Sequence, residues 1–272
     1  MEIKFTKMHG IGNDFVLIDC RDINIADMKA VARKLCDRRF GIGADQLLLL
    51  HSSDKADFRM EIFNADGGEV EMCGNGIRCF AKYLTTHNLT NKTELEIETL
   101  GGIIRPSVRE DLVEVNMGKP ILEGREIPVN LDGRVISRSL EILDRTFDIT
   151  CVSMGNPHCV IFVDDVENFP LTKFGPLIEK HEIFPNRINV EFVEVMNDRE
   201  VRMRVWERGS GETLACGTGA CATAVASILN GKVARRITVH LAGGDLDILW
   251  GEDEIVYMTG AAEEVFEGVI EI

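Results

Sequence analysis

Residues 68–76 read GEVEMCGNG, and residues 211–219 read GETLACGTG. Both stretches follow the pattern Gly-Glu-x-x-x-Cys-Gly-[Asn/Thr]-Gly, and their cysteines, Cys73 and Cys216, lie 143 positions apart (216 − 73). This separation is about half of the 272-residue chain, and a pattern that repeats at a fixed separation indicates an internal duplication. We therefore expect two copies of one structural plan, each with a glycine-flanked thiol.

The same separation of 143 residues relates further positions outside these two stretches. The matched pairs are Gly12-Asn13 with Gly155-Asn156, Gln46 with Asn189, and residues 58–64 with residues 201–207. Each pair lies beside or within an apolar run that is typical of a strand. Together with the cysteines, these matches share one register without a gap, which favours duplication over chance.

Helical patterns follow both cysteine motifs. One covers residues 77–84, and the other covers residues 220–229 and stops at Asn230-Gly231. The second is small and apolar nearly all round, which predicts a buried central helix. Further helices are predicted over residues 27–39 and 171–183, and strands are predicted over residues 94–99, 103–109, 111–117 and 245–250.

These patterns predict an α+β fold built from two pseudo-symmetric α/β domains. Each domain is expected to be a curved, mainly antiparallel sheet around a central helix, with a cleft between the two domains. The junction is expected near Gly118-Lys119-Pro120. This gives an N-terminal half of residues 1–117 and a C-terminal half of residues 118–262.

The formal net charge of −15 argues against nucleic acid and anionic membranes as partners, because clustered Lys and Arg bind such surfaces. Residues 1–7 do not begin a signal peptide pattern, and no apolar stretch approaches the roughly 18 residues that span a bilayer. We expect a cytoplasmic protein whose eight cysteines are thiols. The chain has no Cys-x-x-Cys pair, and no metal site is predicted.

The two cysteine motifs suit proton transfer at carbon. A cysteine at the start of a helix lies beside backbone N–H groups that have no partner within the helix. The positive end of the helix dipole is expected to lower the thiol pKa from about 8.5 toward neutrality, and the same N–H groups can hold a carboxylate. Two such thiols suit an enzyme that removes a proton from one face of a carbon and returns a proton to the other. This chemistry needs no cofactor, and no nucleotide or phosphate motif is present.

Several other candidate residues have a plain structural alternative. Six cysteines are interpreted as small buried core residues: Cys20, Cys36, Cys79, Cys151, Cys159 and Cys221. His158 could be an isolated structural histidine. Glu207 and Arg208 could form an ordinary ion pair on the surface. We favour contact with a ligand for these residues, because Asn156 beside His158 repeats Asn13, and because Glu207 ends an apolar strand just before the second cysteine motif.

Five motifs make the chain resemble the diaminopimelate epimerases. They are MHGIGNDF at residues 8–15, NADG at residues 64–67, MCGNGIRC at residues 72–79, GNPH at residues 155–158, and ERG followed by LACGTGAC within residues 207–221. The resemblance runs essentially from end to end. It implies a cofactor-independent epimerase that converts LL-2,6-diaminoheptanedioate to the meso isomer, for lysine and peptidoglycan synthesis. It further implies a homodimer and a last strand, residues 263–272, that returns to the first domain.

The resemblance also implies roles for individual residues. Cys73 and Cys216 match the two acid/base residues, His158 matches a catalytic auxiliary, and Glu207 matches a catalytic residue and partner for an ammonium group. The implied substrate contacts are Asn13, Gln46, Asn64, Gly74, Asn75, Asn156, Asn189, Glu207, Arg208, Gly217 and Thr218. Arg208 suits the distal carboxylate, since a guanidinium binds a carboxylate through two parallel hydrogen bonds.

Three alternative functions remain open from the sequence. A two-thiol racemase of the proline racemase kind has a related layout, although the many Asn and Gln residues and the Glu207-Arg208 pair favour a longer substrate with two amino acid ends. A hydrolase or transferase with one Cys and His158 leaves the second cysteine motif unexplained. A non-catalytic binding protein with the same fold predicts affinity without isotope exchange.

Overall fold

The computed structural model describes residues 1–23 and 25–271. The chain forms two compact units. Unit 1 contains Met1–Asn116 and the residues from Thr259 onward, and unit 2 contains Met117–Met258. The sequence placed the junctions at residues 117/118 and 262/263. Ile272, the last residue of the expected returning strand, lies outside the described residues.

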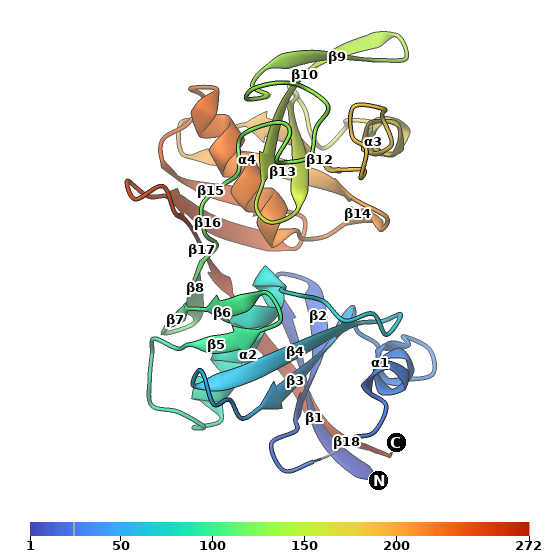
Figure 1. Ribbon diagram of the computed structural model, residues 1–272, viewed down its shortest axis with the longest axis vertical. Coiled ribbons are helices and arrows are strands. Elements are labelled where there is room, and N and C mark those ends of the chain that lie inside the picture. Colours follow the sequence, from blue (N-terminus) through green and yellow to red (C-terminus); the bar gives the residue numbers. More distant parts are fainter. Residues whose placement is uncertain (24, 272) are drawn as a thin grey trace. The chain divides into compact units, whose positions relative to one another are not determined.

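Unit 1 is built on a seven-stranded sheet with the order β18-β1-β2-β3-β4-β5-β6 (Figure 1). Its strands are β1 (Glu2–Gly10), β2 (Asn13–Asp19), β3 (Gln46–His51), β4 (Phe58–Asn64), β5 (Ile97–Thr99), β6 (Gly102–Ile104) and β18 (Glu263–Glu271). The antiparallel hairpin of β7 (Pro106–Arg109) and β8 (Leu112–Asn116) follows. The helices are α1 (Met28–Cys36) and α2 (Gly74–Thr86).

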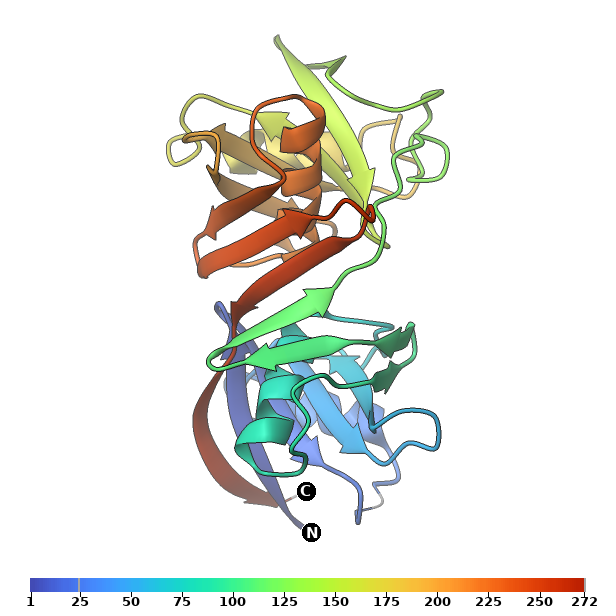
Figure 2. The ribbon, with the colours of Figure 1, turned by 90° about the vertical axis from the view of Figure 1, so that its left-hand side faces the viewer.

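Unit 2 repeats this plan with the strand order β17-β16-β15-β13-β12-β11-β10-β9, and β14 pairs with β13. The strands are β9 (Arg138–Ile142), β10 (Arg145–Ser153), β11 (Pro157–Phe162), β12 (Asn189–Val195), β13 (Glu200–Glu207), β14 (Gly211–Thr213), β15 (Arg236–Leu241), β16 (Gly244–Trp250) and β17 (Val256–Ala261). The helices are α3 (Leu171–Glu179) and α4 (Gly217–Leu229). β17 carries the chain back into unit 1, where it continues into β18 (Figure 2).

The internal duplication is confirmed element by element. A shift of 143 residues converts the bounds of β1, α1 and α2 into those of β10, α3 and α4 without any correction. β18 pairs with β1 in unit 1 as β9 pairs with β10 in unit 2. The C-terminal strand β18 therefore takes the place beside β1 in unit 1 that β9 takes beside β10 in unit 2.

The α+β prediction is also confirmed, because most strand pairs are antiparallel. The parallel pairs recur at matching places: β2 with β3 and β4 with β5 in unit 1, and β11 with β12 and β13 with β15 in unit 2.

Both faces of the central strands are covered, which explains their continuous apolar runs. In unit 1, Val16 and Leu47 point toward α1 and belong to a core cluster with Leu35, whereas Phe15 and Leu48 point toward the first turn of α2. In unit 2, α3 covers one face. The helix α4 is buried over nearly its whole length, as its all-round apolar sequence predicted.

Some element bounds differ from the sequence prediction. α1 ends at Cys36 rather than at residue 39, because Asp37 is extended (φ −60°, ψ 121°) and its carboxylate accepts hydrogen bonds from the backbone N–H groups of Arg39 and Phe40. α3 ends at Glu179 rather than at residue 183. The single strand expected over residues 103–109 is two strands, β6 and β7, interrupted at Arg105. Among the described residues, no helix has the length and apolarity needed to cross a membrane.

Candidate active site

Three predicted residues of unit 1 lie where neighbouring strands of its sheet begin or end on the same side. Asn13 opens β2, Gln46 opens β3 and Asn64 closes β4. The strand register places Phe15 opposite Gln46 and Gln46 opposite Asn64. Gln46 Nε2 donates a hydrogen bond of 2.8 Å to Asn64 Oδ1. Residues far apart in the sequence therefore converge because the strand ends coincide.

Cys73 is the N-cap residue of α2. Its Sγ accepts a hydrogen bond of 3.4 Å from the backbone N–H of Gly76 and lies 3.9 Å from Asn13 Oδ1. Asn75 Nδ2 donates to the same Asn13 oxygen at 3.2 Å. Gly74 and Asn75 are the first two residues of the helix, so their backbone N–H groups have no partner within it. The thiol and two backbone donors thus lie together at the positive end of the helix dipole.

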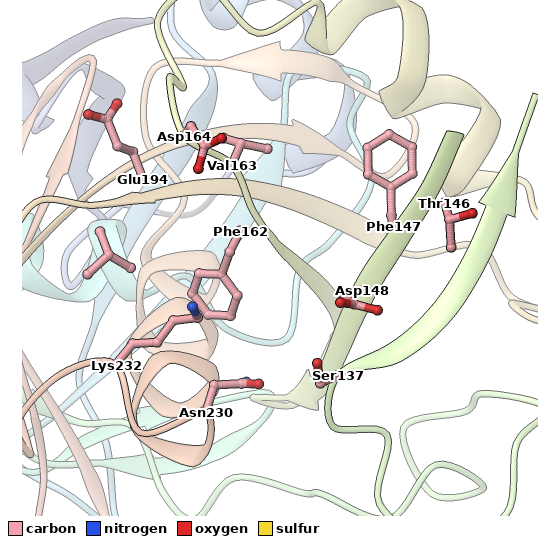
Figure 3. Close-up of a pocket in the computed structure, with 11 residues that line it drawn as sticks. Ser137, Thr146, Phe147, Asp148, Phe162, Val163, Asp164, Glu194, Asn230 and Lys232 are labelled. Atoms are coloured by element: carbon pink, nitrogen blue, oxygen red, sulfur yellow. The ribbon is translucent and has the colours of Figure 1, made fainter. Parts of the chain in front are cut away.

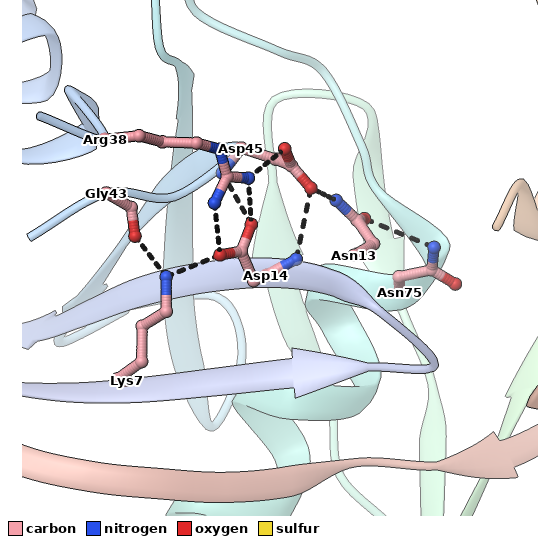
Figure 4. Close-up of polar contacts among 7 residues, drawn as sticks. All are labelled: Lys7, Asn13, Asp14, Arg38, Gly43, Asp45 and Asn75. Atoms are coloured by element: carbon pink, nitrogen blue, oxygen red, sulfur yellow. Dashed lines mark hydrogen bonds and ion pairs between the residues drawn. The ribbon is translucent and has the colours of Figure 1, made fainter. Parts of the chain in front are cut away.

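Asp45 fixes the orientation of Asn13 (Figure 4). Asn13 Nδ2 donates to Asp45 Oδ2 at 2.7 Å, which leaves Oδ1 for Cys73 and Asn75. Arg38 Nη2 bonds to Asp45 Oδ1 at 2.7 Å and holds that carboxylate in place. The sequence analysis missed Asp45. Its signal is a carboxylate next to Gln46 at the start of a buried strand.

Asp14 anchors the same network from the next position along the chain. Its carboxylate accepts two hydrogen bonds from the Arg38 guanidinium, at 2.7 and 2.9 Å, and forms an ion pair with Lys7 Nζ at 2.6 Å. Burial acts to raise the pKa of Asp14, but the hydrogen bonds and charges of Arg38 and Lys7 outweigh it and hold that pKa well below its usual range.

Unit 2 places its predicted residues at the matching edge. Asn156 precedes β11, Asn189 opens β12 and Glu207 closes β13. Asn189 Nδ2 donates to Pro157 O at 2.8 Å, and its Oδ1 accepts from the backbone N–H of Arg208 at 2.9 Å. Asn189 therefore ties the end of β13 to the start of β11 across the sheet edge.

Cys216 is the N-cap residue of α4, and only 5% of its surface is exposed. Its Sγ lies 3.6 Å from Thr218 Oγ1. Burial, followed by the negative charges of Glu207 and Glu191, raises the pKa of this thiol well above its ordinary value of 9.0. The position of Cys216 at a helix start predicts a lowered pKa. That expectation is wrong for Cys216, because desolvation and two carboxylates outweigh the helix end and the Thr218 hydroxyl.

His158 is fully buried and lies between two polar partners. Its Nδ1 is 2.6 Å from Glu191 Oε1, and its Nε2 is 3.0 Å from Asn156 Oδ1. Burial raises the pKa of Glu191, while the neighbouring His158 opposes that rise. The sequence analysis missed Glu191. Its signal is an isolated carboxylate within the apolar strand NVEFV.

A turn after β13 presents Glu207 and Arg208. Thr213 Oγ1 donates to Glu207 Oε1, and Arg208 is exposed with one guanidinium nitrogen 3.3 Å from Asn186 O. Buried Glu179 at the end of α3 braces this turn, since it accepts from Trp206 Nε1 at 2.8 Å and from the Gly209 N–H at 3.1 Å. Glu179 was also missed by the sequence analysis.

The six cysteines interpreted as core residues are all buried, which confirms that interpretation. A pocket of about 550 Å³ in unit 2 lies away from the predicted site residues, none of which line it (Figure 3). Its lining includes Asp148, Phe162 and Lys232, and the Lys232 ammonium lies 4.8 Å from the centre of the Phe162 ring. Neither cysteine motif contributes a residue to this pocket.

Comparison with known proteins identifies the family. The sequence model of the family described as Diaminopimelate epimerase matches residues 5–123 and 150–265. The chain belongs to the diaminopimelate epimerase family. Within this family, the chain is 54% identical over 272 residues to the diaminopimelate epimerase of Pelotomaculum thermopropionicum, with 97% of each chain covered. It is 52% identical over 277 residues to that of Methanococcus maripaludis, with 99% of this chain and 100% of the relative covered.

The diaminopimelate epimerase fold of this chain also occurs in solved structures of distant sequence. A PhzF-family phenazine biosynthesis protein of Bacillus anthracis superposes with a TM-score of 0.74 at 18% identity, over 100% of both chains. A hydroxyproline epimerase of Agrobacterium vitis superposes with a TM-score of 0.70 at 14% identity, over 99% of this chain and 92% of that one. At such identities the likeness concerns the fold alone.

Proposed function

We propose that this protein converts LL-2,6-diaminoheptanedioate to meso-2,6-diaminoheptanedioate, in the synthesis of lysine and peptidoglycan precursors. Membership of the family, with more than half of all residues identical to named diaminopimelate epimerases, carries the proposal. The duplicated Cys-capped helix starts support the reaction type, because each combines a thiol with backbone donors suited to a carboxylate.

In the proposed mechanism Cys73 and Cys216 act on opposite faces of one α-carbon. One cysteine, as thiolate, takes the α-proton, and the electron pair of the broken C–H bond remains on the carbon. The other cysteine, as thiol, gives its proton to the opposite face and becomes the thiolate. The backbone N–H groups of Gly74, Asn75, Gly217 and Thr218 bind the neighbouring carboxylate and stabilise the charge that develops on it. No cofactor takes part.

The remaining polar residues recognise the second amino acid group of the substrate. Arg208 binds the distal carboxylate, Glu207 binds an ammonium group, and His158 assists proton transfer. Asn13, Gln46, Asn64, Asn156 and Asn189 complete the contacts. A site built from such groups rejects a substrate that lacks the second carboxylate far more strongly than an apolar pocket rejects an altered chain length.

The deciding experiment is proton NMR of LL-diaminopimelate with the reduced protein in heavy water. We expect loss of the α-proton signal and appearance of the meso isomer. Proline and trans-4-hydroxyproline serve as comparison substrates, because a hydroxyproline epimerase shares the fold. Exchange on hydroxyproline with none on diaminopimelate would replace the proposal with a proline racemase type of activity.

Single cysteine variants test the two-base mechanism separately from the substrate. Cys73→Ala and Cys216→Ala should each lose epimerisation in both directions, since each direction needs one base and one acid. The expected loss is at least about 1,000-fold in kcat. Turnover close to that of the wild type in either variant would exclude the two-base mechanism. A covalent adduct at Cys73 in Cys216→Ala, seen by mass spectrometry, would favour a single-nucleophile mechanism instead.

We further propose that the protein is a cytoplasmic homodimer. β18 ends the strand order of its sheet and exposes about half of each of Val265, Phe266 and Val269. An apolar edge strand suits pairing with a second copy of the chain. Light scattering should give twice the chain mass, and Phe266→Glu should lower it toward that of the monomer. A monomeric wild-type protein at micromolar concentration would contradict the dimer.

A further inference from the structure

The two copies differ in chemical character at a pair of neighbouring buried positions beside the cysteine motifs. Phe15 and Leu48 in unit 1 correspond to His158 and Glu191 in unit 2, at the same shift of 143 residues (158 − 15 and 191 − 48). In each unit the pair lies on two adjacent parallel strands, β2 and β3 or β11 and β12. One framework therefore carries an apolar pair in the first copy and an ionisable pair in the second.

Phe15 and Leu48 in unit 1, and Glu191 in unit 2, lie against the start of the cysteine-capped helix. A Cβ added at Gly76 would lie 3.4 Å from Phe15 Cε1 and 3.3 Å from Leu48 Cδ2. A Cβ added at Gly219 would lie 2.9 Å from Glu191 Oε1 and 3.2 Å from Cys216 Sγ. Apolar side chains therefore pack against the start of α2 beside Cys73, whereas the carboxylate of Glu191 packs against the start of α4 beside Cys216.

The Glu191–His158 pair holds one proton between two atoms. With 2.6 Å between Nδ1 and Oε1, a hydrogen must lie on one or the other, because two lone pairs cannot approach so closely. Both side chains are fully buried. Within the described part of the chain, Glu191 Oε2 has no hydrogen-bond partner, so this oxygen belongs to no wider structural network.

Stability does not explain this pair. Replacing a buried ion pair with apolar side chains of similar size is often neutral or stabilising. Unit 1 demonstrates that Phe and Leu fill the equivalent positions in the same fold, with no exposed surface on either. The retained charge in unit 2 therefore points to a role in the chemistry of Cys216.

We propose that Glu191 is a positioning residue that orients His158 and keeps Cys216 in its thiol form in the substrate-free protein. This inference rests on the proposed two-thiol function. The charged groups that act on Cys216 are Glu191 from β12 and Glu207 from the end of β13, while the Thr218 hydroxyl and the start of α4 act in the opposite sense. His158, from β11, binds Glu191 and limits its effect. The pair makes the two half-sites unequal before substrate binds, which a two-base epimerase needs because one thiol must start as the acid.

The test uses Glu191→Gln, which keeps the shape of the side chain and removes its charge. Substrate-free protein is treated with iodoacetamide at pH 8, and the alkylation of each cysteine is followed by peptide mass spectrometry. Loss of the carboxylate should make Cys216 alkylation about tenfold faster, which corresponds to one unit of thiol pKa. Cys73 should be unaffected and serves as the internal reference. Glu194→Gln, three residues along the same strand, is the matched control and should match the wild type.

A second readout does not depend on access of a reagent to a buried thiol. In the pH profile of kcat/KM, the alkaline limb reports the acid of the free enzyme. That limb should move to lower pH by about one unit in Glu191→Gln and should stay in place in Glu194→Gln. A variant with an unchanged alkaline limb and unchanged Cys216 reactivity would overturn the inference, as would a shift of either readout in the opposite direction.

The double variant His158→Phe/Glu191→Leu copies the pair of unit 1 and separates function from folding. It should melt cooperatively within a few degrees of the wild type while kcat falls by about 100-fold or more. Wild-type turnover would show that the pair has no role in the chemistry. Loss of the fold would show that the pair is structural. The alkylation result is independent of any epimerase activity. It therefore still judges Glu191 if diaminopimelate proves not to be the substrate.

Discussion

Asn13 Nδ2 donates a 2.7 Å hydrogen bond to Asp45 Oδ2, and this bond decides which end of the Asn13 amide faces Cys73. Without the carboxylate, the amide can rotate and present its NH2 group to the thiol. The Asn13 oxygen also accepts a hydrogen bond of 3.2 Å from Asn75 Nδ2, so a rotated amide would lose this contact with the start of α2 as well. Asp45 therefore controls the chemistry of a residue that it does not touch.

Asp45→Ala is expected to lower kcat by about 10-fold, with a smaller change in KM, because the acting residues remain and only their alignment is lost. Steady-state kinetics with LL-diaminopimelate measures this split. Asp111→Asn, at a side chain that is 99% exposed, is the control and should match the wild type. An Asp45→Ala enzyme with unchanged kcat would show that Asn13 is oriented by other contacts.

The two helix-start glycines should differ in their tolerance of alanine. A Cβ at Gly219 meets Glu191 Oε1 at 2.9 Å, whereas the nearest atom to a Cβ at Gly76 is Leu48 Cδ2 at 3.3 Å. Gly219→Ala must displace the buried carboxylate and should lower kcat by about 100-fold or more. Gly76→Ala needs a smaller adjustment by a leucine methyl group and should keep more activity. Equal losses in the two variants would argue against the special packing of Glu191.

Glu179 is expected to govern substrate affinity rather than proton transfer. It braces the turn that presents Arg208 through Trp206 and Gly209. Glu179→Gln keeps the shape of the side chain but removes its charge, which weakens its hydrogen bonds to this turn. Arg208 is then held less well for substrate binding, so KM should rise by about 10-fold with a smaller change in kcat. Glu182→Gln, at an exposed position three residues along, provides the comparison. A selective fall in kcat would contradict this assignment.

Asp14 should make the folding of unit 1 depend on acidity. The pKa of Asp14 in the folded protein lies below its value of about 3.9 in an unfolded chain. Its stabilisation is therefore fully present above about pH 4 and declines as the pH falls toward the folded-state pKa. Urea unfolding at pH 7 should show Asp14→Asn destabilised by roughly 1–3 kcal/mol. The difference from the wild type should shrink steadily at lower pH, and a difference that is independent of pH would contradict the linkage.

The duplication could be predicted from the sequence because it leaves a direct record in residue spacing. Two glycine-flanked cysteines 143 positions apart predicted the paired helix starts, and the apolar character of residues 220–229 predicted a buried helix. The predicted helix ends were less accurate. α1 ends because the Asp37 side chain bonds to the backbone N–H groups that follow it, although the helical pattern of the sequence continues. The resemblance to the family supplied the roles of the site residues that spacing alone leaves open.

The repeated plan, the family and the residues with obvious chemistry, such as Cys73 and Cys216, can be read from the sequence. The carboxylates that support these cysteines become apparent only in the folded chain. Asp45 and Glu191 lie 32 and 33 positions from the residues they bind, Asn13 and His158, and the pairs meet because parallel strands bring distant positions into register. The pKa of Cys216 likewise depends on desolvation and on the distance to two carboxylates, and neither quantity exists until the chain has folded.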